Sequence, residues 1–251
     1  MSGLPPDAPA ASGRRADTGW LTARPFAHRG LHGPDASENG MAAFKAAIAA
    51  CYGVECDVRV SRDGVPFVFH DVDLQRMSGR AEAIATLDAD ALDDMRLPDG
   101  GVVPRLSALL ALCGDRTPLL VEIKAEGAQV RALCQGVADA LAGHEAAPVA
   151  IMSFNPHVVR WFARQRNGQR RGLVLTLQGK GRLRRAVEQA LALWIARPDF
   201  LACDIRDLPT ALSRRARARG MPVLTWTVRC TADHERAARH ADQIIFEAAR
   251  D

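Results

Sequence analysis

Short apolar runs alternate along this chain with segments in which apolar residues recur every three or four positions. The first pattern is typical of buried strands and the second of helices that pack one face on a core. Two helical stripes are the clearest, Met41/Phe44/Ile48/Cys51 and Val130/Leu133/Val137/Leu141. The nine predicted strands are Pro25–His28, Val54–Val60, Pro66–His70, Leu119–Lys124, Val149–Phe154, Gly172–Leu177, Phe200–Ile205, Pro222–Val228 and Gln243–Phe246.

One connection between predicted strands is too short for a parallel repeat. Only five residues separate Val60 from Pro66, whereas a parallel return needs about a dozen or more. Asp63-Gly64 is a hairpin-turn signal, so we expect Pro66–His70 to run antiparallel and to begin an insertion at about 61–105. The eight remaining strands, connected mostly by helices, predict a single α/β domain with the (β/α)8 TIM-barrel fold.

The rest of the chain adds little to this single domain. Residues 1–18 are rich in Pro, Gly, Ala and Asp, which predicts a flexible tail, and residues 19–251 form the barrel. We expect Thr18–Arg24 to cover part of the barrel, because the chain ends soon after the last predicted strand. No apolar run is long enough to span a bilayer and no signal peptide is evident, so we expect a cytoplasmic location.

Composition excludes some partners. The formal net charge is +4, and only three lysines are present, so arginine carries the positive charge. This mild excess without a clustered patch argues against nucleic-acid binding. The six cysteines are scattered without a CxxC pair, which favours free buried thiols over disulfides or zinc ligands.

Several acidic residues lie near predicted strand ends. Alternation along a strand directs Glu55 and Asp57 to one face, and Glu122 and Lys124 to one face of their own strand. The carboxyl ends of barrel strands form the active-site face, where three carboxylates repel one another unless a cation lies among them. Oxygen ligands suit one divalent cation such as Mg²⁺ or Ca²⁺. Ion pairs with Arg29, Arg59 and Lys124 are the alternative.

Other polar residues surround this group. His28 and His70 are candidates for proton transfer, because imidazole titrates near neutral pH. Arg29 and Lys124 are candidates for holding phosphate oxygens. Trp226 is expected either to wall the pocket or to pack in the core.

Three further polar residues are given structural roles. We expect Asn39 to cap the helix that begins at Met41, with Glu38 favoured by the helix dipole. Asp71 is expected to orient its neighbour His70 or to cap a turn.

A family resemblance covers the chain from about Pro25 to about Phe246. The motifs that carry it, in order, are His28-Arg29-Gly30, Glu38-Asn39, Glu55-x-Asp57, Asp63-Gly64, His70-Asp71, Glu122-Ile123-Lys124, Ser153-Phe154 and Trp226-Thr227-Val228. Their order and spacing resemble the glycerophosphodiester phosphodiesterase family. The resemblance implies a TIM barrel with a small insertion after the second strand. It also implies metal binding by Glu55, Asp57 and Glu122, acid–base catalysis by His28 and His70, and phosphate contacts from Arg29 and Lys124.

The chain departs from the family pattern in three places. Ser37 stands where Pro is frequent before Glu-Asn, and Arg229 where Asn is frequent after Trp-Thr-Val. The last strand reads Ile245-Phe246-Glu247 instead of Ile-Thr-Asp. These departures bear on substrate contacts at that side of the barrel and remove no catalytic group.

The expected reaction is metal-dependent hydrolysis of a small anionic glycerophosphodiester to sn-glycerol 3-phosphate and an alcohol. Either water or the neighbouring glycerol hydroxyl can serve as nucleophile, and the order in which the histidines act, the head group, the choice between Mg²⁺ and Ca²⁺ and the oligomeric state stay open. A lysophospholipase D-like activity is the first alternative. A non-catalytic phosphate-binding barrel is an alternative of another class, and a glycosidase explains neither histidine nor Arg29.

One basic segment suggests contacts beyond the site. Residues 178–185 follow the fifth barrel strand and combine two glycines with four basic residues. They are expected to steer anionic diesters or to contact an anionic membrane surface peripherally, unless they are merely a solvated helix start.

Overall fold

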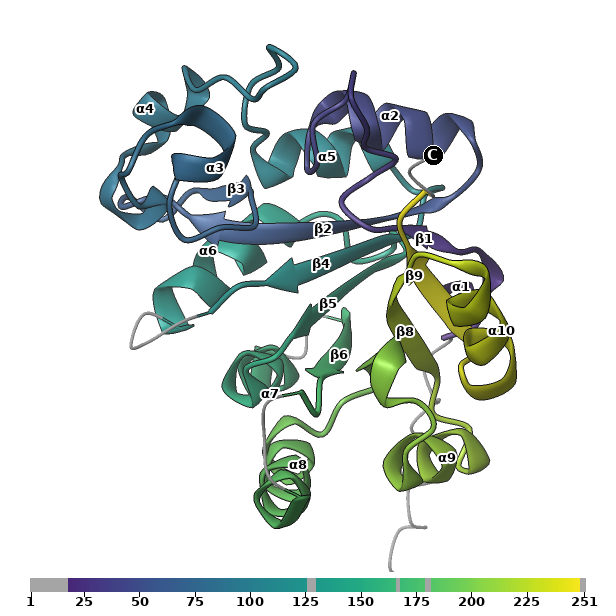
Figure 1. Cartoon of the computed structure of the whole chain (residues 1–251). Coiled ribbons are helices and arrows are strands. Elements are labelled where there is room, and N and C mark those ends of the chain that lie inside the picture. Colours follow the sequence, from purple (N-terminus) through teal and green to yellow (C-terminus); the bar gives the residue numbers. More distant parts are fainter. Residues whose placement is uncertain (1–17, 126–129, 166–167, 179–181, 249–251) are drawn as a thin grey trace, which may run out of the picture.

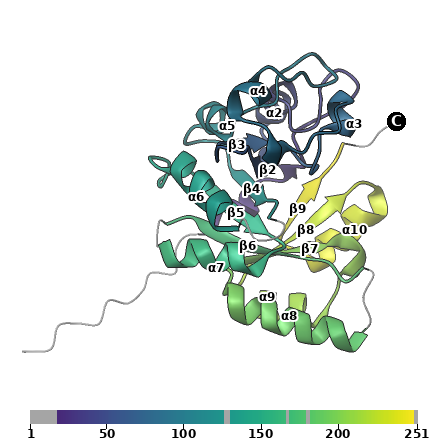
Figure 2. The ribbon, with the colours of Figure 1, turned by 90° about the vertical axis from the view of Figure 1, so that its left-hand side faces the viewer.

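The chain forms a closed barrel of eight parallel strands surrounded by helices (Figures 1 and 2). The computed structural model describes residues 18–248 except 126–129, 166–167 and 179–181, and the side chains of 182–186 are also excluded. Hydrogen bonding between the first and last barrel strands closes the ring and confirms the predicted TIM barrel. The barrel strands are β1 (Phe26–Ala27), β2 (Gly53–Val60), β4 (Leu119–Ile123), β5 (Val149–Ser153), β6 (Arg170–Leu175), β7 (Phe200–Asp204), β8 (Val223–Val228) and β9 (Gln243–Phe246).

The outer layer of the barrel is helical, as the apolar stripes predict. Phe44 and Val137 are fully buried against the outward-facing residues of β2, which include Val54 and Val58. Cys51, expected to end the first stripe, lies beyond its helix and is exposed, as is Cys230, so two of the free thiols are not buried. The larger helices are α2 (Met41–Ala49), α5 (Leu106–Cys113), α6 (Val130–Leu141), α7 (Pro156–Gln165), α8 (Arg182–Ala196), α9 (Ala211–Ala218) and α10 (Thr231–His240).

The insertion follows β2 as predicted. Strand β3 (Pro66–Val68) runs antiparallel to β2, with Val60 opposite Pro66 and Val58 opposite Val68. It leads into α3 (Gln75–Ser78), η1 (Ile84–Thr86) and α4 (Ala89–Asp93). Phe67, Leu74, Ile84 and Leu92 are fully buried in a small core of their own. This core fixes the insertion at the carboxyl end of β2 (Figure 1).

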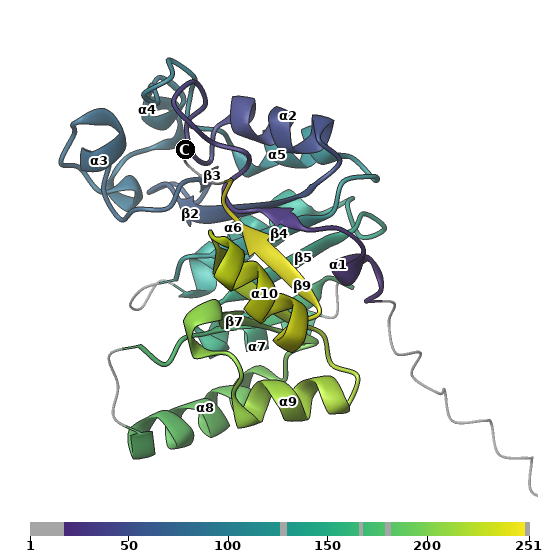
Figure 3. The ribbon, with the colours of Figure 1, turned by 45° about the vertical axis from the view of Figure 1, so that its right-hand side comes forward.

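The inside of the barrel is filled by side chains. Phe26, Phe200 and Leu224 are fully buried there, together with Leu21 from α1 (Trp20–Ala23). Helix α1 therefore covers the end of the barrel opposite the insertion (Figure 3), in agreement with the expectation for residues 18–24. The Phe200 ring packs so closely that a Cβ built on Gly172 would lie 2.3 Å from it.

Residues 1–17 of the expected flexible tail and residues 179–181 of the basic segment lie outside the described residues. Within the described ranges, no helix has both the length and the apolar character needed to cross a bilayer.

Candidate active site

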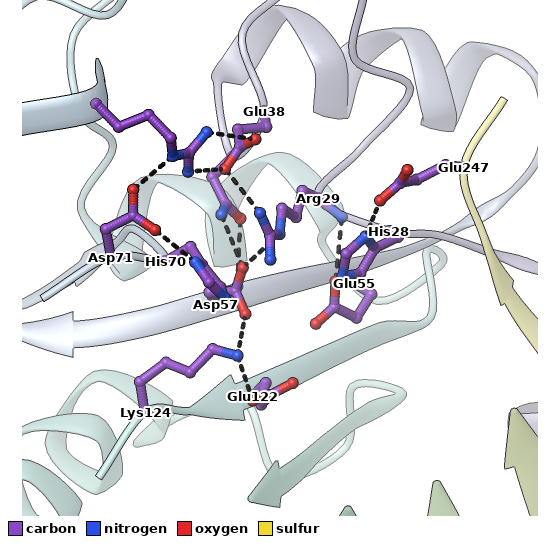
Figure 4. Close-up of polar contacts among 12 residues, drawn as sticks. His28, Arg29, Glu38, Glu55, Asp57, His70, Asp71, Glu122, Lys124 and Glu247 are labelled. Carbon is purple, nitrogen blue, oxygen red and sulfur yellow. Dashed lines mark hydrogen bonds and ion pairs between the residues drawn. The ribbon is translucent and has the colours of Figure 1, made fainter. Parts of the chain in front are cut away.

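The predicted polar residues meet at the carboxyl ends of the first strands (Figure 4). His28 and Arg29 follow β1, Glu55 and Asp57 lie on β2, and Lys124 follows β4, while the insertion supplies His70. A cavity of about 480 Å³ is lined by both histidines, Arg29, Glu55, Glu122 and Lys124. The strand register explains the convergence, because Asp57 pairs directly with Glu122 on the neighbouring strand. Residues that lie far apart in the sequence, from His28 to Lys124, thus form one site.

Glu55, Asp57 and Glu122 form a buried carboxylate cluster. Each offers an oxygen that lies within 4.8 Å of the others. Burial, reinforced by Asp57, raises the pKa of Glu55 to about 7, and burial also raises the pKa of Glu122. Oε1 of Glu55 is buried without a hydrogen-bond partner. An unpartnered carboxylate oxygen inside an all-oxygen donor set fits a hard divalent cation.

Asp57 is the most heavily paired of the three carboxylates. Its Oδ2 lies 2.9 Å from Nε of Arg29, and its Oδ1 lies 2.9 Å from Nζ of Lys124. Lys124 also contacts Oε1 of Glu122. Burial opposes ionisation of Asp57, but Lys124 and Arg29 outweigh it and lower its pKa. Ion pairing therefore exists alongside the carboxylate cluster, and Arg59 donates to the His70 carbonyl at 2.8 Å.

Asn39 has a different role from the expected helix cap. Helix α2 begins after Gly40, and no side chain caps it. The Asn39 backbone has φ of 58°, a left-handed conformation that asparagine tolerates better than most residues. Its amide donates to Oδ2 of Asp57 at 3.0 Å and accepts from the Asp57 backbone N–H at 3.2 Å. The cap prediction was wrong because the buried Asp57 takes both ends of the amide.

His28 is held by its Nδ1 atom. This nitrogen lies 2.8 Å from Oε1 of Glu247, while Nε2 lies 3.9 Å from Oε2 of Glu55. Burial lowers the pKa of the imidazole, but Glu55 and Glu247 together outweigh burial and raise it. Glu247 entered the sequence analysis only as a departure from the family pattern. The signal that could have found it is its place directly after the last barrel strand.

His70 is held in the same way from the insertion. Its Nδ1 lies 2.7 Å from Oδ1 of Asp71, and Oδ2 of Asp71 accepts from Nε of Arg76 at 2.6 Å. Burial lowers the pKa of His70 more than Asp57 and Asp71 raise it. Arg76 also donates to both oxygens of Glu38, at 2.6 and 3.0 Å. Sequence analysis did not identify Arg76, because nothing in its local pattern distinguishes it from other exposed arginines.

Glu38 links this network back to Arg29. Its Oε1 accepts from NH1 of Arg29 at 2.8 Å, so one carboxylate is shared between Arg29 and Arg76. These contacts lower the pKa of Glu38 despite partial burial. Arg76 of the insertion thereby connects His70, through Asp71, to Arg29, through Glu38.

The opposite wall of the cavity is aromatic. The rings of Trp226 and Phe154 meet edge-to-face with centroids 5.5 Å apart. Nε1 of Trp226 donates to the Ala202 carbonyl at 3.1 Å, which fixes the indole, and Phe154 is 43% exposed. Both rings line the cavity, and Trp226 also packs against the core inside the barrel, so the structure shows both of the contacts expected for Trp226.

Solved structures resemble the whole fold. A glycerophosphodiester phosphodiesterase from Thermotoga maritima is 25% identical, with a TM-score of 0.72 and coverage of 88% of this chain and 92% of that one. One from Parabacteroides distasonis is 22% identical, with a TM-score of 0.73 and coverage of 89% and 92%. A phosphodiesterase from Oleispira antarctica, solved with the product sn-glycerol-3-phosphate, is 21% identical, with a TM-score of 0.73 and coverage of 88% and 91%.

The sequence itself matches a protein family. The model of the glycerophosphoryl diester phosphodiesterase family matches residues 28–246, which include every polar residue of the site except Glu247. No curated protein is significantly similar to the chain. The fold and the family match define a phosphoric diester hydrolase. The chain belongs to the glycerophosphoryl diester phosphodiesterase family.

Proposed function

We propose that this enzyme hydrolyses glycerophosphodiesters to sn-glycerol 3-phosphate and an alcohol in a metal-dependent reaction, with His28 and His70 as the acid–base pair. One observation carries the proposal. Two histidines line the same cavity as two members of a buried carboxylate cluster, Glu55 and Glu122, in a chain of this family.

The substrate phosphate is held by Arg29 and Lys124. Their side chains are 15% and 14% exposed, and both line the cavity, so each has surface available to an anion. Arg29 presents a guanidinium fork and Lys124 a point charge. Bound by Glu55, Asp57 and Glu122, one Mg²⁺ or Ca²⁺ would neutralise charge on a non-bridging phosphate oxygen and lower the pKa of the nucleophile.

Proton transfer falls to the two imidazoles. Each has Nδ1 engaged by a carboxylate, Glu247 for His28 and Asp71 for His70. Nε2 is therefore the nitrogen that each ring has left for the substrate. One histidine accepts the proton of the nucleophile, and the other protonates the leaving alkoxide.

A second substrate class is favoured by the aromatic wall. Phe154 and Trp226 offer an apolar surface beside the phosphate site, which suits the acyl-bearing side of a lysophospholipid. A lysophospholipase D-like activity would release lysophosphatidate and the head-group alcohol.

The test is a substrate panel with and without metal. The purified chain is assayed against glycerophosphodiesters and lysophospholipids after treatment with excess chelator, and again after addition of Mg²⁺ or Ca²⁺. We expect turnover of glycerophosphodiesters to vanish on chelation and to return with metal. Full activity in metal-free protein would refute the role of the carboxylate cluster. Phosphate binding without turnover of any substrate would instead identify a non-catalytic barrel.

A further inference from the structure

Arg229 and Glu247 form a forked ion pair at the wall of the cavity. Nε of Arg229 donates to Oε2 of Glu247 at 2.8 Å, and NH2 donates to Oε1 at 2.9 Å. The same Oε1 lies 2.8 Å from Nδ1 of His28, a contact that Figure 4 shows. A carboxylate only accepts hydrogen bonds, so Nδ1 of His28 carries a proton in this arrangement. The three side chains are thus linked by a continuous series of hydrogen bonds that runs from Arg229 through Glu247 to His28.

The backbone holds these three residues at adjacent strand ends. Arg229 follows β8, Glu247 follows β9 and His28 follows β1, and these strands are neighbours in the barrel. The Glu247 N–H donates to the Val228 carbonyl at 3.0 Å, and the His28 N–H donates to the Phe246 carbonyl at 2.8 Å. The Arg229 N–H donates to Oδ2 of Asp233 at 3.2 Å. The backbone hydrogen bonds between neighbouring strands therefore extend to these residues and hold their side chains next to one another.

Stability alone does not explain this arrangement. The side chain of Arg229 is 58% exposed, and ion pairs of such residues contribute about 0–1 kcal/mol. Glu247 and His28, in contrast, are 15% and 11% exposed. The hydrogen bond from His28 and the two from Arg229 lower the pKa of Glu247, so the carboxylate stays ionised. The most evident consequence of these hydrogen bonds is that they orient the His28 ring.

We propose that Glu247 and Arg229 are positioning residues for His28. Glu247 accepts the Nδ1 proton and so directs Nε2 into the cavity, and Arg229 fixes the rotamer of Glu247 with its fork. Arg229 and Glu247 are also the two departures from the family pattern on this side of the barrel. Because they contact each other, we treat them as a single unit that acts on His28. The catalytic consequence rests on the proposed role of His28, whereas the orientation of the ring does not.

The first experiment separates an action through Glu247 from direct substrate binding. Steady-state kinetics are measured on a glycerophosphodiester for the wild type, Glu247→Gln, Arg229→Gln and the double variant. We expect Glu247→Gln to lower kcat about 10- to 100-fold with little change in KM, part of the usual effect of acid–base catalysis. Arg229→Gln should lower kcat by a smaller factor, and the double variant should be no worse than Glu247→Gln. Arg229→Lys, which keeps the charge and loses the fork, should be intermediate.

A matched control lies at the other end of the same strands. Arg217 pairs with Asp242 at 2.8 Å, and Asp242 in turn accepts from the Val223 N–H at the start of β8. Arg217→Gln therefore removes a comparable arginine–carboxylate pair far from the cavity, and it should leave kcat and KM unchanged. Additive losses for Arg229→Gln and Glu247→Gln, or a rise in KM alone, would assign Arg229 to substrate binding and overturn the proposal.

The second experiment does not depend on activity. Two-bond ¹⁵N–¹H spectra of histidine-labelled protein report which ring nitrogen of His28 carries the proton, at a pH above the titration of the ring. We expect the Nδ1–H form in the wild type and Arg217→Gln, and a shift towards Nε2–H in Glu247→Gln. An unchanged His28 signal in Glu247→Gln would refute the positioning role. An altered signal in a protein without turnover would refute the proposed function while the positioning of the ring stands.

Discussion

Lys124 offers the sharpest test of how charge is balanced in the buried cluster. Its Nζ lies 2.9 Å from Oδ1 of Asp57 and also contacts Glu122. Lys124→Met keeps the aliphatic stem and removes the ammonium group. Asp57 then retains Arg29 and Asn39 at Oδ2 but loses the partner of its Oδ1, and Glu122, which is 6% exposed, loses its contact with Lys124. Breaking a buried pair by removing one partner costs about 3–5 kcal/mol.

The lower end of that range applies here, because burial already raises the pKa of Glu122 and lets it take up a proton. For a domain of this size about 3 kcal/mol corresponds to a Tm lower by about 6–12 °C. Thermal unfolding in chelator, followed by calorimetry or circular dichroism, measures the shift. Lys45→Met is the matched control, because Lys45 is exposed on α2, and surface substitutions usually change stability by less than about 0.5 kcal/mol.

Added divalent cation extends the test. A cation bound by Glu55, Asp57 and Glu122 compensates the charge that Lys124→Met leaves behind, so Mg²⁺ or Ca²⁺ should raise the Tm of the variant more than that of the wild type. A variant with a wild-type Tm in chelator would refute the electrostatic reasoning. Equal stabilisation of both proteins by the cation would show that the cation and Lys124 do not share Glu122.

Three other predictions test the site and its scaffold. His28→Ala and His70→Ala should each lower kcat at least ~10²-fold with the fold retained, and a folded variant with near wild-type kcat would make that histidine structural. Arg76→Gln removes one partner from Asp71 and one from Glu38, and the groups they hold, His70 and Arg29, should then be misplaced enough to lower kcat/KM about tenfold. Arg80→Gln, which breaks the neighbouring Arg80–Glu82 pair, should have no effect in the same assay. Gly172→Ala forces a methyl group against Phe200 and should cost about 1–3 kcal/mol in chemical denaturation, while Gly33→Ala, with open space around its Cβ, should not.

Local rules predicted most of the fold. The strand runs, the Asp63-Gly64 turn and the shared face of Glu55 and Asp57 depend on neighbours in sequence, and all three are present in the structure. Two predictions were wrong: Cys51 and Cys230 are exposed instead of buried, and Asn39 does not cap the helix. The Asn39 error arose from the same locality. A capping rule considers only the helix that follows, whereas Asp57, eighteen positions away, takes the Asn39 side chain.

The residues that sequence analysis missed depend on closure of the ring. Glu247 reaches His28 across 219 positions because β9 pairs with β1. Arg76 reaches Glu38 because the insertion folds back over the carboxyl end of β2. Neither contact produces a periodic pattern in the sequence, so the sequence alone does not reveal them.

The allocation of charge in the cluster gives a physical reason for a divalent cation. Three buried carboxylates face the permanent cations Arg29 and Lys124, both of which contact Asp57. Arg29 is also shared with Glu38, so the three carboxylates are incompletely compensated, and Glu55, with its unpartnered oxygen, is where the uncompensated charge falls at high pH. A phosphodiester brings one further negative charge into the same cavity, so a divalent ion bound by the cluster would offset charge of both the carboxylates and the substrate. The cation and the substrate anion should therefore favour each other's binding, because each relieves the imbalance that the other creates.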